Sequence, residues 1–140
     1  MTDQVKKLFR AAGQRLTIAE ALLNSHGALL EALYLGGYSI ECCMKSMILR
    51  SVAPSQRDAF CEEEFRGKNP HNFEWLYGKW KLLNCEPLPA HLRDRIRSAN
   101  LIWNTDLRYE TGTGGRSLDD VSFVLELAHD LRQWVERRLK

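Results

Sequence analysis

Two sets of charged residues have the types and spacing to bind or transform a ligand. Glu41 and Lys45 are four residues apart with the acid first, the order that favours an ion pair on one helix face. This pair would either line a polar pocket or form an ion pair at a solvated surface or an interface. Arg93, Arg97 and Arg108 could together bind an anion, because the planar guanidinium group forms two hydrogen bonds to a phosphate. Acidic neighbours could instead neutralise this patch: Asp94, Asp106 and Glu110.

Several uncharged or weakly basic side chains could add to that chemistry. Tyr109 and Trp103 could stack on a nucleic-acid base, although aromatic residues at helical spacing are also typical of a core. Asn104 can donate and accept hydrogen bonds, but its amide cannot serve as a general base near neutral pH. His71 carries the imidazole that general acid–base chemistry often uses, and Arg66 precedes it by five residues. The position of His71 near a predicted helix start also fits a capping or surface role.

The remaining motifs predict neither a metal site nor a cofactor. There is no CxxC pair and no HExxH sequence, and adjacent Cys42 and Cys43 would point in different directions on a helix. Nucleophile motifs such as GxSxG are also absent. The first fifteen residues lack the apolar core of a signal peptide. We therefore expect reduced, mostly buried thiols in a cytoplasmic protein.

The composition is that of one globular domain, which we expect to span residues 1–140. Apolar residues make up 44% of the chain and charged residues 27%, so there is enough apolar content for a core and disorder is excluded over most of its length. The formal net charge is +2, so nucleic-acid binding would need a local patch rather than a basic arm. No apolar run approaches the roughly 20 residues of a membrane span, and we expect no membrane partner.

Apolar residues recur at spacings of three and four along most of the chain, which predicts helices rather than strands. We expect five helices, at about residues 3–24, 28–52, 70–83, 89–103 and 118–139. Gly27 should end the first helix, Asn69 and Pro70 should begin the third, and Ser117 and Asp120 should cap the last. Residues 55–68 are polar and predict a long connection, which has room for a short helical turn. The predicted fold is an all-α antiparallel helical bundle with long second and last helices.

The second predicted helix contains two adjacent glycines, Gly36 and Gly37. Together they cost roughly 1–2 kcal/mol in helix propensity. We expect a compensating close approach of another backbone, either within the bundle or across a dimer.

The order of several motifs resembles that of the HEPN family (higher eukaryotes and prokaryotes nucleotide-binding). Residues 33–47 read LYLGGYSIECCMKSM, similar to a family helix with an aromatic residue, small residues, an apolar–Glu pair and an apolar–Lys pair. Ile40-Glu41 and Met44-Lys45 supply those two pairs. Residues 71–76 (HNFEWL) and 103–109 (WNTDLRY) resemble later family segments, and the last helix ends in a similar RQWVE sequence. The resemblance spans about residues 5–139.

The resemblance implies a compact helical bundle that is commonly a homodimer. The family includes metal-independent ribonucleases, toxins paired with nucleotidyltransferase-type antitoxins, and members thought only to bind nucleotides or RNA. Its ribonucleases carry an arginine, four to six residues, then a histidine. Arg66 and His71 match this pattern, but thirteen arginines and four histidines predict about one such match by chance. In the segment after Arg97, where a histidine would stand, this chain has Asn104, so it lacks the usual ribonuclease motif.

Three functional hypotheses follow. The first is a nucleotide- or RNA-binding protein, part of a toxin–antitoxin or defence pair, with its ligand in a groove that contains the following residues: Glu41, Lys45, Arg97, Asn104, Arg108 and Tyr109. The second is a metal-independent endoribonuclease that uses Arg66 and His71. The third is a non-catalytic helical module that binds only a partner protein.

Overall fold

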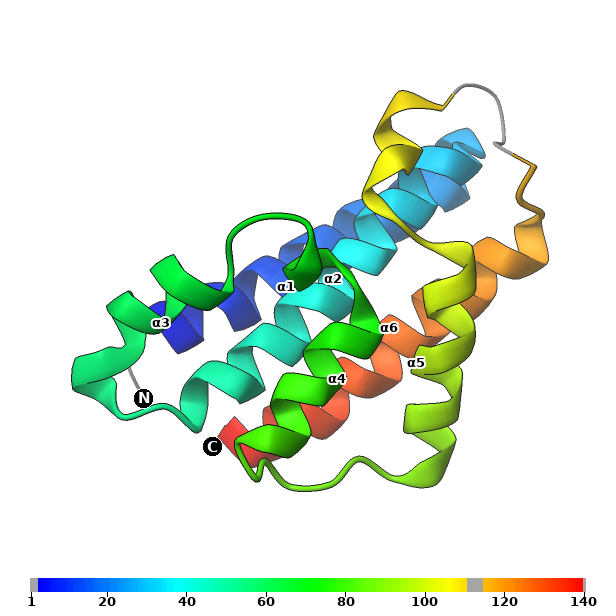
Figure 1. Ribbon diagram of the computed structural model, residues 1–140. Helices are drawn as coiled ribbons and strands as arrows, with labels where there is room; N and C mark the ends of the chain where they lie inside the picture. Colours follow the sequence, from blue (N-terminus) through cyan, green and yellow to red (C-terminus); the bar gives the residue numbers. More distant parts are fainter. Residues whose placement is uncertain (1–2, 111–114, 140) are drawn as a thin grey trace.

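The computed structural model describes residues 3–110 and 115–139 (Figure 1), and within them it contains helices and no strand. The all-α prediction is therefore confirmed. The six α-helices are α1 (Asp3–Ala21), α2 (Leu29–Arg50), α3 (Arg57–Glu64), α4 (Phe73–Leu82), α5 (Ala90–Ile102) and α6 (Leu118–Leu139). Four short helical turns connect them: η1 (Leu22–His26), η2 (Pro54–Gln56), η3 (Asn69–His71) and η4 (Thr105–Tyr109). None of the described helices is both long enough and apolar enough to cross a membrane.

Helix α2 is the centre of the bundle. It packs against α1, α4, α6 and the turn η4, and Figure 1 shows α1, α2 and α6 running along the long axis of the molecule. Every residue from 39 to 49 is buried. This stretch includes Ser39, Glu41, Lys45 and Ser46, whose polar groups must find partners inside the protein because buried unpaired polar groups cost free energy. Ser39 Oγ does so by donating to the Ala12 carbonyl oxygen of α1 at 2.7 Å.

Two of the three predicted helix boundaries are confirmed. Gly27 has a left-handed backbone (φ +60°), and its N–H donates to the carbonyl oxygens of Leu22 and Leu23 at the end of η1. Ser117 and Asp120 form the reciprocal capping box: Ser117 N–H donates to Asp120 Oδ2 at 3.0 Å, and Asp120 N–H donates to Ser117 Oγ at 3.2 Å. Leu118, the first residue of α6, has an apolar side chain that is 56% exposed at this helix start.

The predicted start of the third helix is wrong. Asn69 and Pro70 lie in the short turn η3, and Asn72 caps α4 by accepting a hydrogen bond from Trp75 N–H at 3.0 Å. Asn72 has the extended backbone that an N-cap residue needs, with φ −100° and ψ 122°. The extra turn separates His71 from the helix and leaves its side chain free to reach α2.

The predicted connection at residues 55–68 contains a full helix, α3. Its first residue, Arg57, is buried, and its guanidinium donates to the carbonyl oxygens of Leu49 (2.9 Å), Val52 (2.9 Å) and Arg50 (3.1 Å). Carbonyl groups at the end of a helix have no partner within the helix. Arg57 therefore caps α2 with its side chain and ties the start of α3 to the end of α2.

The glycine pair of α2 admits side chains rather than a second backbone, which corrects the prediction. A Cβ atom at Gly37 would lie 2.1–2.3 Å from the Trp103 indole, and one at Gly36 would lie 2.4 Å from Leu125 Cδ2. The indole Nε1 donates to the Tyr34 carbonyl oxygen at 3.0 Å, and its ring stacks on Phe73 with centroids 5.1 Å apart. Trp103 is therefore a core residue and is not available to stack on a base.

We predict that Gly37→Ala destabilises the protein strongly, because the new methyl group must displace a fully packed indole. Overpacking of this kind costs about 1–3 kcal/mol. Gly78→Ala is the matched control, since Gly78 is an exposed residue inside α4 with no atom within 4 Å of a new Cβ. That change should stabilise the protein by up to about 1 kcal/mol through helix propensity. Urea unfolding measures both, and equal effects of the two substitutions would contradict the packing described for Trp103.

Candidate functional site

The structure brings Glu41, Lys45 and His71 together. Glu41 is only 1% exposed, and its two carboxylate oxygens have different partners. Oε2 accepts a hydrogen bond from Lys45 Nζ at 2.9 Å, and Oε1 lies 2.8 Å from His71 Nδ1. Lys45 follows Glu41 by one turn of α2, whereas His71 comes from η3, thirty residues later. Because both oxygens are occupied and buried, Glu41 can act on a ligand only through its two partners.

The bond to Glu41 determines which nitrogen of the imidazole carries a proton. An ionised carboxylate only accepts hydrogen bonds, so Nδ1 is the donor, and in the neutral form of the ring the lone pair is on Nε2. The His71 side chain is 31% exposed, whereas the carboxylate that orients it is buried. The site therefore has a ring held from behind by a buried charge and open on another side, which is the arrangement of a histidine prepared to exchange a proton.

Local backbone structure delivers His71 to that position. Its N–H donates to the Lys68 carbonyl oxygen at 3.2 Å, and the next N–H, of Asn72, donates to the Asn69 carbonyl oxygen at 2.9 Å. Asn100 Oδ1 accepts the first N–H of α4, from Phe73, at 2.8 Å. The turn is thus fixed to α5 on one side and to α2 on the other.

A row of half-buried side chains adjoins the imidazole. The Tyr38 ring lies 6.2 Å from the His71 ring, the Tyr34 ring lies 5.4 Å from Tyr38, and the Arg15 guanidinium lies 5.3 Å above the Tyr38 ring. We call these four residues the Tyr38 surface: Arg15, Tyr34, Tyr38 and His71. It combines one cation, two phenol rings and one imidazole.

Burial and the negative charge of Glu41 together determine the protonation of the neighbouring Tyr38 and Cys42. Burial raises the pKa of the Tyr38 hydroxyl above its ordinary value, and the negative charge of Glu41 raises that pKa further, while Arg15 opposes both. The same two causes raise the pKa of the neighbouring Cys42 thiol to about 11. Tyr38 and Cys42 therefore remain protonated near neutral pH, and Cys42 is not a nucleophile.

Lys45 is also enclosed. Its side chain is 11% exposed, and its ammonium lies 5.2 Å from the centre of the Phe65 ring, which belongs to the segment after α3. With Glu41 on one side and an aromatic face on the other, Lys45 neutralises the buried carboxylate. Glu41 therefore largely neutralises the positive charge of Lys45 inside the protein, and little of that charge acts on a ligand outside.

The other predicted binding residues lie on α5 and η4 and make different contacts. Arg97 is 65% exposed and lies 3.6 Å from Glu74, and Asn104 caps η4 by accepting Asp106 N–H at 2.9 Å. Tyr109 is 74% exposed, and the Arg108 side chain lies outside the described part of the structure. The cavity beside Arg93 and Arg97 measures about 10 Å³, which is about the space of a single water.

Arg66, which the sequence spacing pairs with His71, also has a different partner in the structure. Arg66 is 70% exposed and forms an ion pair with Glu62 at 2.7 Å within the region that ends α3. None of the contacts described for Arg66 involves His71. Arg15 is the cation over the Tyr38 ring, which in turn adjoins the imidazole.

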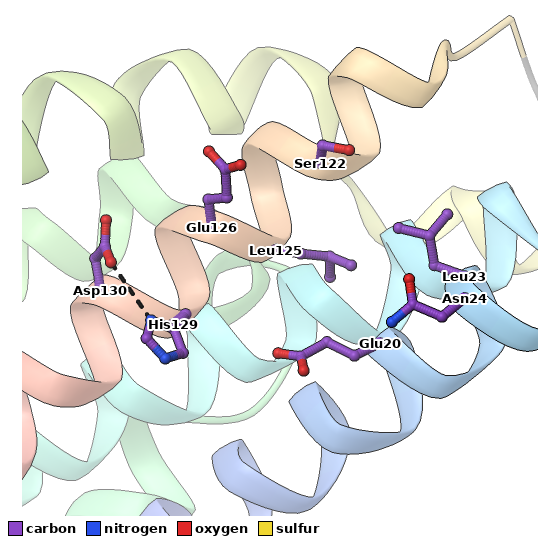
Figure 2. Close-up of a pocket in the computed structure, with 8 residues that line it drawn as sticks. All are labelled: Glu20, Leu23, Asn24, Ser122, Leu125, Glu126, His129 and Asp130. Atoms are coloured by element: carbon purple, nitrogen blue, oxygen red, sulfur yellow. Dashed lines mark hydrogen bonds and ion pairs between the residues drawn. The ribbon is translucent and has the colours of Figure 1, made fainter.

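Larger cavities lie on other parts of the bundle. One of about 370 Å³ borders the Tyr38 surface, because Tyr34 lines it together with Glu31, Glu110 and leucines of α2, η1 and η4. Another, of about 430 Å³, lies between α6 and the end of α1, and Figure 2 shows Glu126, His129 and Asp130 along one side of it with Glu20 opposite. Among the described residues, no group of histidine, cysteine and carboxylate side chains could hold a metal ion.

No family model matches this sequence, and neither a curated protein nor a solved structure is significantly similar to it. The HEPN resemblance consequently stays a prediction.

Sequence reasoning missed Arg15, Tyr34 and Tyr38 as site residues, and it did not connect His71 with Glu41. One signal was present: Tyr34, Tyr38, Glu41 and Lys45 follow one another at spacings of four, three and four, which places them on one face of a helix. Arg15 had no such signal, because its approach to Tyr38 depends on how α1 packs on α2.

We predict that Glu41→Gln lowers the free energy of unfolding by about 3–5 kcal/mol, the cost of leaving a buried charge without its partner. Lys45→Met should be similarly destabilising, and the double variant should lose much less than the sum, because neither charge then remains. Glu62→Gln is the matched control: it also breaks an i,i+4 pair, but an exposed one, and should change stability by no more than about 0.5 kcal/mol. Additive single effects in urea unfolding would show that Glu41 and Lys45 are not coupled.

Proposed function

We propose that the protein binds RNA or nucleotides through the Tyr38 surface. The observation that carries this proposal is the bond between buried Glu41 and half-buried His71, whose ring adjoins Tyr38 and, through Tyr38, Tyr34 and Arg15. A folded protein retains a buried carboxylate at a cost, and here the carboxylate orients a ring at the surface. The support for RNA or nucleotide as the ligand class is the HEPN resemblance, which also supports a homodimer paired with a nucleotidyltransferase-type protein.

Each residue of the surface has a distinct role in the proposal. Arg15 donates hydrogen bonds to a phosphate, the His71 Nε2 lone pair accepts one from a ribose hydroxyl, and the Tyr34 and Tyr38 rings stack on bases. The cavity of about 370 Å³ that Tyr34 lines gives room for a base, within the usual size range of ligand sites. Glu41 and Lys45 are positioning residues, because their side chains are enclosed. Arg97, Asn104, Arg108 and Tyr109 form the competing surface, which the same experiments test.

Binding can be tested by fluorescence anisotropy with a labelled single-stranded RNA of about 20 nucleotides. We expect Arg15→Gln to weaken binding about tenfold, since a charge-assisted hydrogen bond contributes roughly 1.5–3 kcal/mol. Tyr38→Leu should weaken it similarly, whereas Tyr38→Phe, which keeps the ring, should bind like the wild type. The affinity should fall as salt rises.

Arg97→Gln provides the matched control, because it removes the same charge from an exposed arginine on α5. It should leave the affinity within about twofold, as expected for the loss of a screened surface charge. If Arg97→Gln weakens binding and Arg15→Gln does not, the ligand binds the α5 and η4 surface instead. If no variant changes the affinity, or the wild type does not bind, the proposal is wrong.

The same His71–Glu41 bond favours a second candidate, a metal-independent endoribonuclease. In that reaction the lone pair of His71 Nε2 takes the proton of a ribose 2′-OH, and the resulting alkoxide attacks the adjacent phosphorus. The bond from phosphorus to the 5′ oxygen breaks, that oxygen takes a proton from solvent or from the Tyr38 hydroxyl, and a 2′,3′-cyclic phosphate remains. Arg15 is the cation beside the site, in place of the Arg66 suggested by sequence spacing.

The enzyme hypothesis predicts RNA cleavage that persists in EDTA and leaves 2′,3′-cyclic phosphate ends. His71→Ala should slow it by about 10²–10⁴-fold, the usual contribution of a general acid–base group. Arg66→Ala should leave the rate unchanged because Arg66 pairs with Glu62 at the surface. RNA that binds but stays intact in a mass-spectrometric assay of the ends would leave the protein a binder and eliminate this candidate.

A further inference from the structure

A second cationic cavity lies on the other side of α1 from Arg15. Its volume is about 530 Å³, within the range of small-molecule sites. Five of its lining residues come from α1 and one from α6: Arg10, Gly13, Gln14, Thr17, Ile18 and Arg132. This lining has two arginines and no carboxylate.

Arg132 is held in this cavity without a polar partner. Its guanidinium lies over the Phe9 ring, 4.6 Å from the centroid, and fits against Gly13, where a Cβ atom would lie 2.8 Å from Nη2 and 2.9 Å from Nε. Nε is buried and makes no hydrogen bond. No described residue forms an ion pair with either Arg132 or Arg10.

An unpaired, half-buried guanidinium is costly, because each buried donor without an acceptor loses its hydration. Three other half-buried arginines of the described chain, Arg95, Arg116 and Arg138, each pair with a carboxylate. Packing on Phe9 occupies the face of the Arg132 group, so hydrogen bonds can form only at its edge. Glycine at position 13 is what lets that edge lie against α1.

We propose that this cavity binds the phosphate group of a small phosphorylated molecule. The two arginines match the charge of a phosphate monoester dianion, and the Nη1–Nη2 edge of Arg132, rather than the Nε edge that lies against Gly13, can bind two of its oxygens. The Gln14 amide adds a neutral donor from the same helix. Thr17 plays no part as a donor, because its hydroxyl already donates to the Gly13 carbonyl oxygen at 3.0 Å. The site is distinct from the Tyr38 surface and does not depend on the proposed function.

The test is a titration of the ¹⁵N-labelled full chain with inorganic phosphate at constant ionic strength, followed by NMR. We expect saturable shifts of the Gly13 and Thr17 amides and of the Arg132 Nε–H signal. In Arg132→Gln the affinity should fall about tenfold or more, as for the loss of a charge-assisted hydrogen-bond pair. Arg132→Lys keeps the charge but not the planar edge and should also bind more weakly than the wild type.

Arg137→Gln is the control, because Arg137 is an exposed arginine one and a half turns further along α6. The Arg137→Gln variant should bind phosphate like the wild type. Chemical shifts that change linearly with phosphate and never saturate would overturn the proposal, as would equal losses of phosphate affinity in the Arg132 and Arg137 variants. Either result would mean that phosphate is attracted only by the general positive charge of this surface. Succinate in place of phosphate separates a general carboxylate site from a phosphate site: equal or tighter succinate binding overturns the phosphate assignment. RNA binding by Arg132→Gln should be unchanged, so this proposal and the Tyr38 surface can fail separately.

Discussion

The buried carboxylate of Glu41 is the constraint on which the rest of the site depends. A charge that is 1% exposed is tolerated in a protein interior only when partners occupy its hydrogen-bonding positions. Lys45 supplies one partner from the same helix, but the second must come from elsewhere in the chain. His71 supplies it, and that need explains why η3 interrupts the chain before α4. One buried charge in α2 thus determines where a turn thirty residues away must lie.

The packing of Trp103 makes the surface above Glu41 rigid. The indole fills the space left by Gly37, bonds to the Tyr34 backbone, and stacks on Phe73, two residues after His71. Tyr38 lies between, with Trp103 meeting it edge-on at 6.1 Å. Core contacts of Trp103 therefore fix Tyr34 and Tyr38 on one side and the start of α4 on the other. Under the proposed function, this rigidity means that ligand binding requires little ordering of the protein, which preserves affinity.

Periodicity was sufficient to predict α1, α2 and α6, because each long helix buries a continuous apolar stripe. It was insufficient at the start of α4, where Asn69 and Asn72 are both suitable caps and Pro70 fits either a short turn or a first helical turn. A tertiary bond from His71 to α2 decides between them. Likewise the spacing of Glu41 and Lys45 predicted an ion pair. The burial of that pair follows from the packing of α1, α4 and α6 around α2. Arg15 and Arg132 reach their sites only through such packing, so no spacing or motif in the sequence predicted their roles.

Whether a charged side chain already has an oppositely charged partner distinguishes the residues that position other groups from those that can bind an anion. Glu41 and Lys45 neutralise each other in the interior, so they contribute little attraction for an anion outside. Arg97 would have to give up Glu74 to bind one. Arg15 and Arg132 have no carboxylate partner among the described residues, and each instead lies over an aromatic ring, Tyr38 or Phe9. A ring covers the face of a guanidinium group but does not take up the donors at its edge. An anion arriving at either side of α1 displaces no existing ion pair, and for that reason these two arginines, rather than the better-paired ones, are the cations with the most to gain from a phosphate.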